Sequence, residues 1–235
     1  IDPLPFNSLI DVLEDSFERY SKKKFAISFN KKMTYEEVEI QSRKFASYLQ
    51  NNLNLSKGDR IGIMMPNIFQ YSICLFGALR AGIIVVNISL LSRARDLKRI
   101  LLETEAKVLV ALETFSNIIE KCYEGTSLDS VIFTNFGDFL GFPHSFFINF
   151  SHHKSKQSSL ANKIPFATGL KDSLIEADKD LYRRPEMIQS ETAFVQYTAG
   201  TTGSPRPVEL SHSNIMGSIA QWEAWFDPIL ERGKE

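Results

Sequence analysis

The chain has 235 residues, 43% of them hydrophobic and 23% charged, and its formal net charge at pH 7 is −1. This composition is typical of a soluble globular protein, and the balanced charge argues against a broad nucleic-acid-binding surface. No apolar run approaches the roughly 18 residues that a membrane-spanning helix requires. The length fits one large α/β domain.

Helix-like and strand-like segments alternate through the first half of the sequence. Hydrophobic residues recur at steps of three and four between Leu9 and Tyr20, which predicts an amphipathic helix. Thr34, followed three residues later by Glu37, is the signature of a capping box and predicts a helix that runs to about Gln50. The other elements predicted here are strands over residues 25–29, 60–65 and 83–88, and a helix over residues 68–81 that Asn67 caps and Gly82 ends.

The alternation continues with predicted helices over residues 94–103 and 114–123 and predicted strands over residues 107–111, 127–134 and 192–197. This order favours the α/β class, with a parallel β-sheet layered with helices on both faces. Ligands of such sheets bind beyond the carboxyl ends of the strands. Residues that directly follow a predicted strand are therefore the first candidates for a functional site.

Residues 136–165 break the pattern. Seven phenylalanines lie between Phe133 and Phe150, and a segment rich in histidine and lysine follows them at 152–156. Two glycines and a proline between 137 and 143 interrupt any long helix, which favours an irregular Phe-rich connector packed on the core. A membrane-surface contact through the aromatic and basic residues is the alternative. The histidines have no metal-ligand spacing with carboxylate or cysteine partners.

Cys74 and Cys122 both lie in apolar periodic segments. Two buried thiols in a reducing compartment are favoured over a disulfide. The chain begins at Ile1 and shows no signal-peptide pattern, which predicts a cytoplasmic chain that starts inside a longer protein. A peripheral contact with the inner face of the cell membrane stays open.

Residues 197–207, with the sequence YTAGTTGSPRP, directly follow the predicted strand 192–197. Glycines in this segment tolerate backbone angles that other residues avoid, so its N–H groups and hydroxyls can turn toward one point. Consecutive N–H groups form a concavity that binds anions and suits a phosphate chain. Arg206 adds a permanent positive charge.

Two other phosphate-binding motifs do not fit this segment. A Walker A loop that started at Gly200 would need a second glycine where Pro205 stands. The G-x-G-x-x-G fingerprint of pyridine-nucleotide dehydrogenases does not occur in the sequence. A Ser/Thr/Gly-rich turn without a ligand is the remaining alternative.

The order of residues resembles the phosphate loop of the acyl-adenylate-forming (acyl-CoA synthetase) superfamily, Tyr-Thr-[Ser/Thr/Gly]-Gly-Thr-Thr-Gly-x-Pro-Lys-Gly. The residues that match this motif are Tyr197, Thr198, Gly200, Thr201, Thr202, Gly203 and Pro205. The continuation at 208–214 is similar to the superfamily's hydrophobic strand followed by [Ser/Thr]-His-x-Asn.

The resemblance covers nearly the whole chain apart from about residues 136–165. Residues 33–50, 58–67 and 76–87 are similar to the superfamily's early Thr-[Tyr/Phe] helix, its Gly-Asp-Arg element and its helix–Ala-Gly–strand step. Among members of the superfamily, the sequence most resembles bacterial long-chain fatty-acid–CoA ligases. Such enzymes join a carboxylate to the AMP part of ATP, release pyrophosphate, and pass the acyl group to a thiol, usually that of coenzyme A.

The resemblance implies ATP, Mg²⁺, CoA and a fatty acid as cofactors and partners. It also implies nucleotide binding by Tyr197, Thr198, Ala199, Gly200, Thr201, Thr202, Gly203, Ser204 and Arg206. The Thr198 hydroxyl would help to hold Mg²⁺, and Arg206 would be the catalytic residue in place of the motif lysine. The ring of Tyr197 would pack under the loop.

Three departures from the pattern keep alternatives open. Arg206 replaces a lysine, Pro207 replaces a glycine, and residues 89–92 replace the Asn-Pro-Leu-Tyr that members of the superfamily often carry. An adenylate-forming enzyme for another carboxylic acid, or a non-catalytic nucleotide- or lipid-binding relative, would fit as well. A homodimer is also open.

The resemblance places the adenine-binding segment, a later Mg²⁺-binding glutamate, the hinge and the small C-terminal domain with its catalytic lysine beyond residue 235. Residues 1–235 are therefore predicted to be an N-terminal fragment of the AMP-binding large domain, without the C-terminal domain. This fragment alone is predicted to be inactive.

Overall fold

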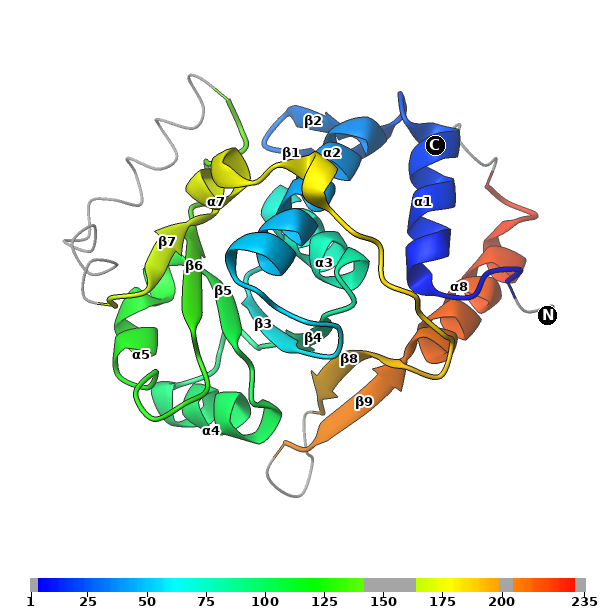
Figure 1. The fold of residues 1–235 in the computed structure, drawn as a ribbon. Helices are drawn as coiled ribbons and strands as arrows, with labels where there is room; N and C mark the ends of the chain where they lie inside the picture. The colour runs from blue at the N-terminus through cyan, green and yellow to red at the C-terminus, as the bar shows by residue number, and fades with distance from the viewer. Residues whose placement is uncertain (1–3, 142–163, 199–204, 231–235) are drawn as a thin grey trace.

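A central sheet runs through the part of the chain that the computed structural model describes, which is residues 4–141, 164–198 and 205–230 (Figure 1). Its strands within these residues are β3 (Arg60–Met64), β4 (Ile84–Asn87), β5 (Val108–Leu112), β6 (Ser130–Thr134), β7 (Ala167–Gly169), β8 (Thr192–Tyr197) and β9 (Pro207–Ser211). Their order across the sheet is β7-β6-β5-β3-β4-β8-β9.

The strands are parallel except at one edge. β9 runs antiparallel to β8, with Pro207 opposite Tyr197. β8 and β9 follow each other in the chain and pair antiparallel, so the two strands are the arms of a β-hairpin, whereas a crossover between parallel neighbours needs about a dozen residues or more. The predicted α/β sheet layered with helices is confirmed, and the antiparallel edge strand makes the sheet mixed rather than wholly parallel.

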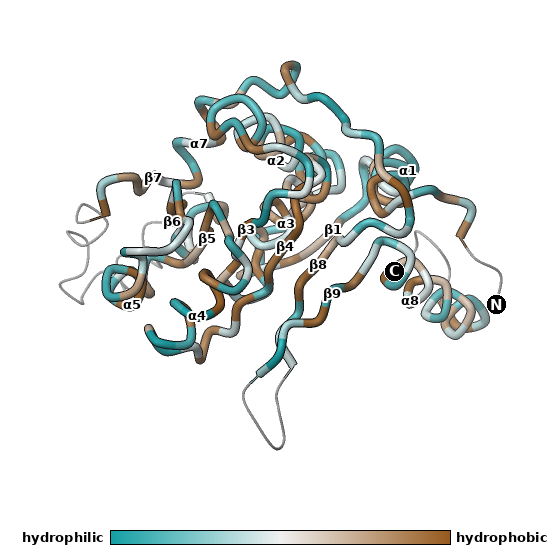
Figure 2. Tube along the Cα trace, turned by 60° about the horizontal axis from the view of Figure 1, so that its bottom comes forward, coloured by the Kyte–Doolittle hydropathy of each residue, from teal (hydrophilic) through white to brown (hydrophobic). Residues whose placement is uncertain are grey.

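Helices cover both faces of the sheet. They are α2 (Tyr35–Ser47), α3 (Phe69–Arg80) and α7 (Leu170–Glu176) on one face, and α4 (Ala94–Thr104) and α5 (Ser116–Glu120) on the other. Along β3, Ile61 and Ile63 join the hydrophobic cluster of the first face, and Met64 joins the cluster of the second. Figure 2 shows hydrophobic residues concentrated along the strands between the two helical layers.

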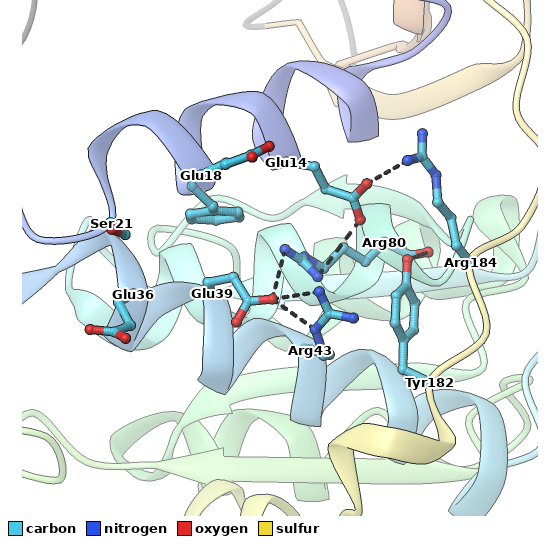
Figure 3. Close-up of a pocket in the computed structure, with 10 residues that line it drawn as sticks. Glu14, Glu18, Ser21, Glu36, Glu39, Arg43, Arg80, Tyr182 and Arg184 are labelled. Carbon is cyan, nitrogen blue, oxygen red and sulfur yellow. Dashed lines mark hydrogen bonds and ion pairs between the residues drawn. The ribbon is translucent and has the colours of Figure 1, made fainter.

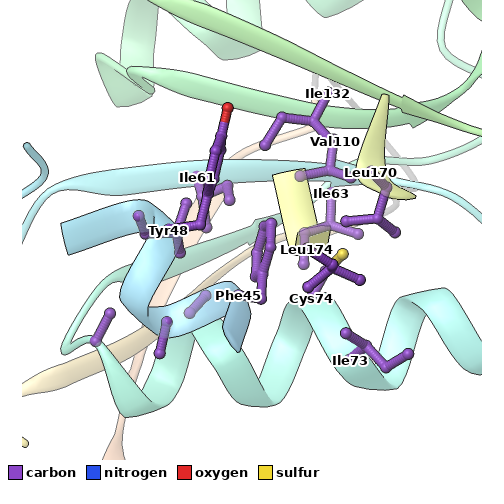
Figure 4. Close-up of a cluster of buried hydrophobic side chains, with 14 of the residues drawn as sticks. Phe45, Tyr48, Ile61, Ile63, Ile73, Cys74, Val110, Ile132, Leu170 and Leu174 are labelled. Atoms are coloured by element: carbon purple, nitrogen blue, oxygen red, sulfur yellow. The ribbon is translucent and has the colours of Figure 1, made fainter. Parts of the chain in front are cut away.

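The largest cluster lies between α2, α3 and the sheet (Figure 4). Phe45 of α2 and Cys74 of α3 are fully buried beside Ile63 and Val110 of the strands. Every residue of β5 and β6 is buried, as expected for strands that are covered on both faces.

Helix ends follow local sequence signals with one exception. The Thr34 hydroxyl accepts from the backbone N–H of Glu37, whose carboxylate accepts from the backbone N–H of Thr34, so the predicted capping box is confirmed. Gly82 ends α3 with φ +73°, also as predicted. The predicted cap at Asn67 is wrong, because a turn between Ile68 N–H and the Pro66 carbonyl moves the start of α3 to Phe69, with Ile68 as N-cap.

Some elements were not among the predicted ones. β1 (Lys24–Ser28) matches the predicted strand 25–29, but its antiparallel partner β2 (Lys31–Thr34) was missed. Phe29 and Asn30 both have positive φ, the backbone of a tight two-residue hairpin turn. The other missed elements are β7, α7, the 3₁₀ turn Lys179–Leu181 and the π turn Tyr48–Asn52 that continues α2.

Two helices lie side by side at the β9 end of the sheet (Figure 1). They are α1 (Leu9–Tyr20), where helical periodicity was predicted, and α8 (His212–Phe226). The Leu9 backbone N–H donates to Nδ1 of His212 over 3.1 Å, and His212 is only 1% exposed. Nδ1 must therefore be unprotonated for this contact to form.

The contact makes stability depend on pH. Burial lowers the pKa of His212 below its ordinary value of 6.5, and Lys57 lowers it further, while Glu191 and Asp11 oppose the shift. The unfolded chain therefore takes up a proton first, so this contribution is complete above about pH 6.5 and is lost as the pH falls. Urea unfolding at pH 7.5 and 5.5 measures how much the free energy of unfolding falls on acidification. This fall is expected to be smaller in His212→Asn than in wild type, because the asparagine oxygen can accept the same hydrogen bond without titrating.

Titration of the neighbouring Glu191 does not account for the expected pH dependence. The hydrogen bond from Lys57 and other contacts hold the pKa of Glu191 below 4.5, so its titration lies at lower pH. An equal decrease in the free energy of unfolding between pH 7.5 and 5.5 in wild type and His212→Asn would contradict the role of His212.

Cys74 and Cys122 are free and buried, in agreement with the prediction of two buried thiols. Burial raises the pKa of the Cys122 thiol to about 11. In the Phe-rich connector, Phe136 and Phe139 pack against the core, and residues 142–163 lie outside the described residues. Among the described helices, none is both long and apolar enough to cross a membrane.

Candidate functional site

The carboxyl ends of β4 and β8 lie next to each other and form the edge where the sequence predicts a ligand. Asn87 ends β4, and its side-chain amide donates to the Gln196 side chain of β8 over 3.2 Å. The Tyr71 hydroxyl donates to the other polar atom of the Asn87 side chain, over 3.1 Å. This polar chain fixes the edge from α3 to β8.

A cavity of about 480 Å³ opens beside this edge. It is lined by residues that follow β4, by residues of α4, by the end of β8 and by Pro205. The lining residues are Asn87, Ile88, Ser89, Leu91, Ser92, Asp96, Arg99, Ile100, Gln196, Tyr197, Thr198 and Pro205.

Three of the predicted site residues come together at the end of the β8–β9 hairpin. Tyr197 is the last residue of β8, Thr198 follows it, and Arg206 directly precedes β9. The backbone N–H of Thr198 donates to the Arg206 carbonyl over 3.1 Å, and the Thr198 hydroxyl contacts the same oxygen over 3.4 Å. Ala199, Gly200, Thr201, Thr202, Gly203 and Ser204 lie outside the described residues.

Tyr197 is half-buried, and its hydroxyl donates to a carboxylate oxygen of Glu103 over 2.8 Å. Burial raises the pKa of the Tyr197 phenol, and the hydrogen bond to Glu103 raises it further. The phenol therefore stays neutral and keeps its donor at physiological pH. Arg206, in contrast, is exposed to solvent at the mouth of the hairpin.

Two departures from the superfamily's motif are accommodated in the structure. Pro207 begins β9, which is an edge strand, where a residue without a backbone N–H is tolerated. Ser89–Ser92 forms its own turn, in which the Ser89 side chain accepts from the N–H of Leu91 and the Ser89 carbonyl accepts from the N–H of Ser92. This turn lines the cavity and leaves Leu91 91% exposed.

Oxygen atoms on the cavity wall suit a hard cation. The Thr198 hydroxyl and the Asp96 carboxylate are donors of the kind that Mg²⁺ prefers, and Mg²⁺ bound to nucleotides takes most other ligands from phosphates and water. Both residues offer oxygen ligands of the right chemistry on the wall of one cavity, and the metal role of Thr198 stays a prediction. In the described part of the chain, no group of three His, Cys, Asp or Glu side chains forms a metal cluster of its own.

Sequence reasoning missed Arg99 and Glu103 of α4, which contact the two arms of the hairpin. The Arg99 guanidinium donates to the Pro205 carbonyl over 3.4 Å, and Glu103 accepts from Tyr197. The only available signal was their spacing of four residues, which puts both on one face of the predicted helix.

A second pocket, of about 590 Å³, lies where α1 and α2 meet the end of α3 (Figure 3). Arg80 is buried there, with carboxylate oxygens of Glu39 and Glu14 at 3.5 Å and 3.9 Å. Glu39 is also paired with Arg43 over 2.7 Å, and Glu14 with Arg184. Arg184 also pairs with Asp11, so three arginines meet three carboxylates in an ion network that joins helices and lies away from the sheet's carboxyl edge.

A family profile described as "AMP-binding enzyme" matches residues 13–232. The chain is 37% identical over 235 residues to a long-chain-fatty-acid–CoA ligase of Escherichia coli O157:H7, covering all of this chain and 42% of that protein. It is 35% identical over 230 residues to the corresponding ligase of Haemophilus influenzae, covering 98% of this chain and 41% of that protein. The chain thus spans about two fifths of the length of these relatives.

Solved structures show the same fold. A long-chain-fatty-acid-CoA ligase from Archaeoglobus fulgidus superposes with a TM-score of 0.72 at 21% identity, over 95% of this chain and 40% of that one. An anthranilate CoA ligase in complex with anthranoyl-AMP superposes with a TM-score of 0.71 at 19% identity, over 89% of this chain and 36% of that one.

Proposed function

Because the chain belongs to the family of AMP-binding enzymes, we propose that it is the N-terminal part of a long-chain fatty-acid–CoA ligase. The observation that carries the proposal is the β8–β9 hairpin, whose phosphate-loop sequence leaves the sheet at its carboxyl edge beside a cavity. Relatives that are 35–37% identical over nearly all of this chain are themselves named long-chain-fatty-acid–CoA ligases, which supports the same substrate class.

In the proposed reaction, a fatty-acid carboxylate oxygen attacks the α-phosphorus of ATP, and the bond to pyrophosphate breaks. The thiol sulfur of coenzyme A then attacks the acyl carbonyl and displaces AMP, so that acyl-CoA forms. The protein must hold two anions together while charge develops on the phosphate oxygens. We assign the β- and γ-phosphates to residues 197–204 and Arg206, where each hydrogen bond to a charged oxygen is worth about 1.5–3 kcal/mol.

The Thr198 hydroxyl is the proposed Mg²⁺ ligand on the hairpin. The metal, when bound with ATP, neutralises charge on the phosphate oxygens. We expect the exposed Arg206 side chain to contact the same phosphates from the other arm, since the hydrogen bond from the Thr198 N–H to the Arg206 carbonyl keeps the two residues together. Its guanidinium supplies a forked, permanently charged donor in place of a lysine.

Arg206→Ala in the full-length protein is expected to lower kcat/KM for ATP by about tenfold or more, because one charge-assisted contact to phosphate is lost. Arg206→Lys is expected to retain most of the activity. Arg95→Ala, which removes an exposed arginine of α4 that does not line the cavity, serves as the control. Unchanged ATP kinetics in Arg206→Ala would sink the role assigned to Arg206.

Product analysis tests the proposed function directly. Full-length protein incubated with palmitate, ATP and coenzyme A is expected to yield palmitoyl-CoA, AMP and pyrophosphate in equal amounts. Thioester formation with an aromatic acid but not with palmitate would point to another carboxylic-acid substrate. Residues 1–235 alone are proposed to complete neither step, since more than half the length of the relatives lies outside the match.

The cellular setting is also a proposal. We place the full-length enzyme in the cytoplasm, with a peripheral contact at the inner face of the cell membrane where fatty acids partition. A homodimer remains a prediction.

A further inference from the structure

One face of α4 contacts both arms of the β8–β9 hairpin. Glu103 accepts a hydrogen bond of 2.8 Å from the Tyr197 hydroxyl at the end of β8. Arg99 donates to the carbonyl of Pro205, on the returning arm, over 3.4 Å. Because residues four apart lie on the same side of a helix, a single helical turn reaches both arms.

The two side chains of α4 also contact each other. Arg99 Nε and a Glu103 carboxylate oxygen are 4.0 Å apart, and their side chains are 33% and 39% exposed. The contacts Tyr197–Glu103, Glu103–Arg99 and Arg99–Pro205 therefore form a continuous bridge from one arm to the other. The bond from Tyr197 is the strong member, because a carboxylate acceptor makes it shorter and stronger than a neutral pair.

A second set of contacts acts between the arms themselves. The Thr198 N–H donates to the Arg206 carbonyl, and Tyr197 lies opposite Pro207 in the strand register. These bonds hold the arms to each other, and the pairing of β8 with β4 fixes β8 in the sheet up to Gln196. The contacts with α4 hold the ends of the arms beyond that pairing, at Tyr197 and Pro205, and α4 itself packs on the sheet through its buried residues Leu97, Ile100 and Leu101.

We propose that Arg99 and Glu103 are positioning residues for ATP, which hold the arms of the hairpin so that Thr198 and Arg206 meet the phosphates in a fixed orientation. The inference rests on the proposed function. This role requires no contact between either side chain and the reacting atoms. Loss of the bridge would leave the hairpin folded but free the ends of its arms, beyond the Asn87–Gln196 pair, to move relative to α4, which weakens binding of ATP and slows adenylation.

Kinetics of ATP–pyrophosphate exchange by the full-length protein test the bridge. Tyr197→Phe and Glu103→Ala are each expected to lower kcat/KM for ATP by about fivefold to tenfold, with the KM for fatty acid unchanged. The double variant is expected to be no worse than the more impaired single variant, because both changes remove the same bond. Glu103→Gln keeps an acceptor and is expected to recover most of the activity.

Glu124→Ala is the matched control, because Glu124 is an exposed glutamate outside the cavity. Additive losses in the double variant, or equal changes in the KM values for ATP and fatty acid, would overturn the inference. If wild type shows exchange and the variants show the same kinetics as wild type, the bridge is refuted and the proposed function is retained. If wild type shows no exchange, the proposed function fails, and calorimetric titration of the same variants with Mg-ATP still tests the bridge: unchanged affinities would overturn it.

Discussion

Arg80→Ala is expected to lower the free energy of unfolding by about 3 kcal/mol, the low end of the cost of removing one partner from a buried ion pair. Arg80 is the largest side chain among the fully buried residues described. Its guanidinium lies over the Phe17 ring at 5.1 Å from the ring centroid and over the Tyr182 ring at 5.9 Å. Alanine would leave a cavity between these rings as well as two carboxylates short of one cation.

The carboxylates keep other partners, which limits the loss. Glu39 and Glu14 stay paired with Arg43 and Arg184, and their side chains are 22% and 28% exposed. Arg80→Met, which fills much of the same volume without a charge, is therefore expected to cost less than Arg80→Ala.

Arg43→Ala is the matched control for the Arg80 variants. The Arg43 side chain is 37% exposed, and its loss is expected to cost about 1 kcal/mol or less. Urea unfolding of the three variants gives the comparison. A free energy of unfolding for Arg80→Ala within 0.5 kcal/mol of wild type, taken here as roughly the limit for ordinary surface changes, would show that the network does not hold the helices together.

Gly77→Ala is expected to destabilise the protein by about 1–3 kcal/mol, although alanine is the better helix former by about 1 kcal/mol. A Cβ atom at Gly77 would come within 2.8 Å of the Ser42 backbone carbonyl and 2.8 Å of the Phe45 ring. The two helices α2 and α3 pack closely at this point. A backbone carbonyl cannot turn away as a side chain can, so the helices would have to separate.

Gly217 of α8 provides the opposite case, because a Cβ atom there would meet nothing within 4 Å. Gly217→Ala is expected to raise the free energy of unfolding by about 0.5–1 kcal/mol through helix propensity alone. Parallel thermal and urea unfolding of the two variants decides the matter. Stabilisation by both substitutions would contradict the close packing at Gly77.

Much of the fold follows from local sequence signals. The capping box at Thr34 and the glycine at position 82 predicted helix ends that the structure confirms. These signals act over a few residues, so the sequence displays them directly. The start of α3 was predicted one residue early, at Ile68 instead of Phe69, because a backbone turn at Pro66 competed with the expected cap at Asn67.

Long-range arrangement was less accessible. The sequence predicted a parallel sheet, but the strand order and the antiparallel pairing of β9 depend on packing between distant segments. The strand β2 was missed because its lysines at 31 and 32 face solvent and only Met33 is buried. A short, exposed strand has too few hydrophobic residues to give a recognisable strand pattern in the sequence.

The candidate site was predicted in part. The motif pointed to Tyr197, Thr198 and Arg206, and the structure brings these three together at the carboxyl edge of the sheet. Their roles toward ATP and Mg²⁺ stay predictions. Arg99 and Glu103 were missed because their contacts join residues about a hundred positions apart in the chain, and no motif marks such pairs.

Fatty-acid-dependent exchange of pyrophosphate into ATP by the full-length protein is the most direct test of the proposed function. The exchange reports formation of the acyl-adenylate without coenzyme A, so it isolates the step assigned to this hairpin. We expect exchange that rises from short to long acyl chains, which would also show that Arg206 and Pro207 permit adenylation. No exchange with any acid, from a protein that is folded by circular dichroism, would contradict the proposal and favour a non-catalytic binding relative.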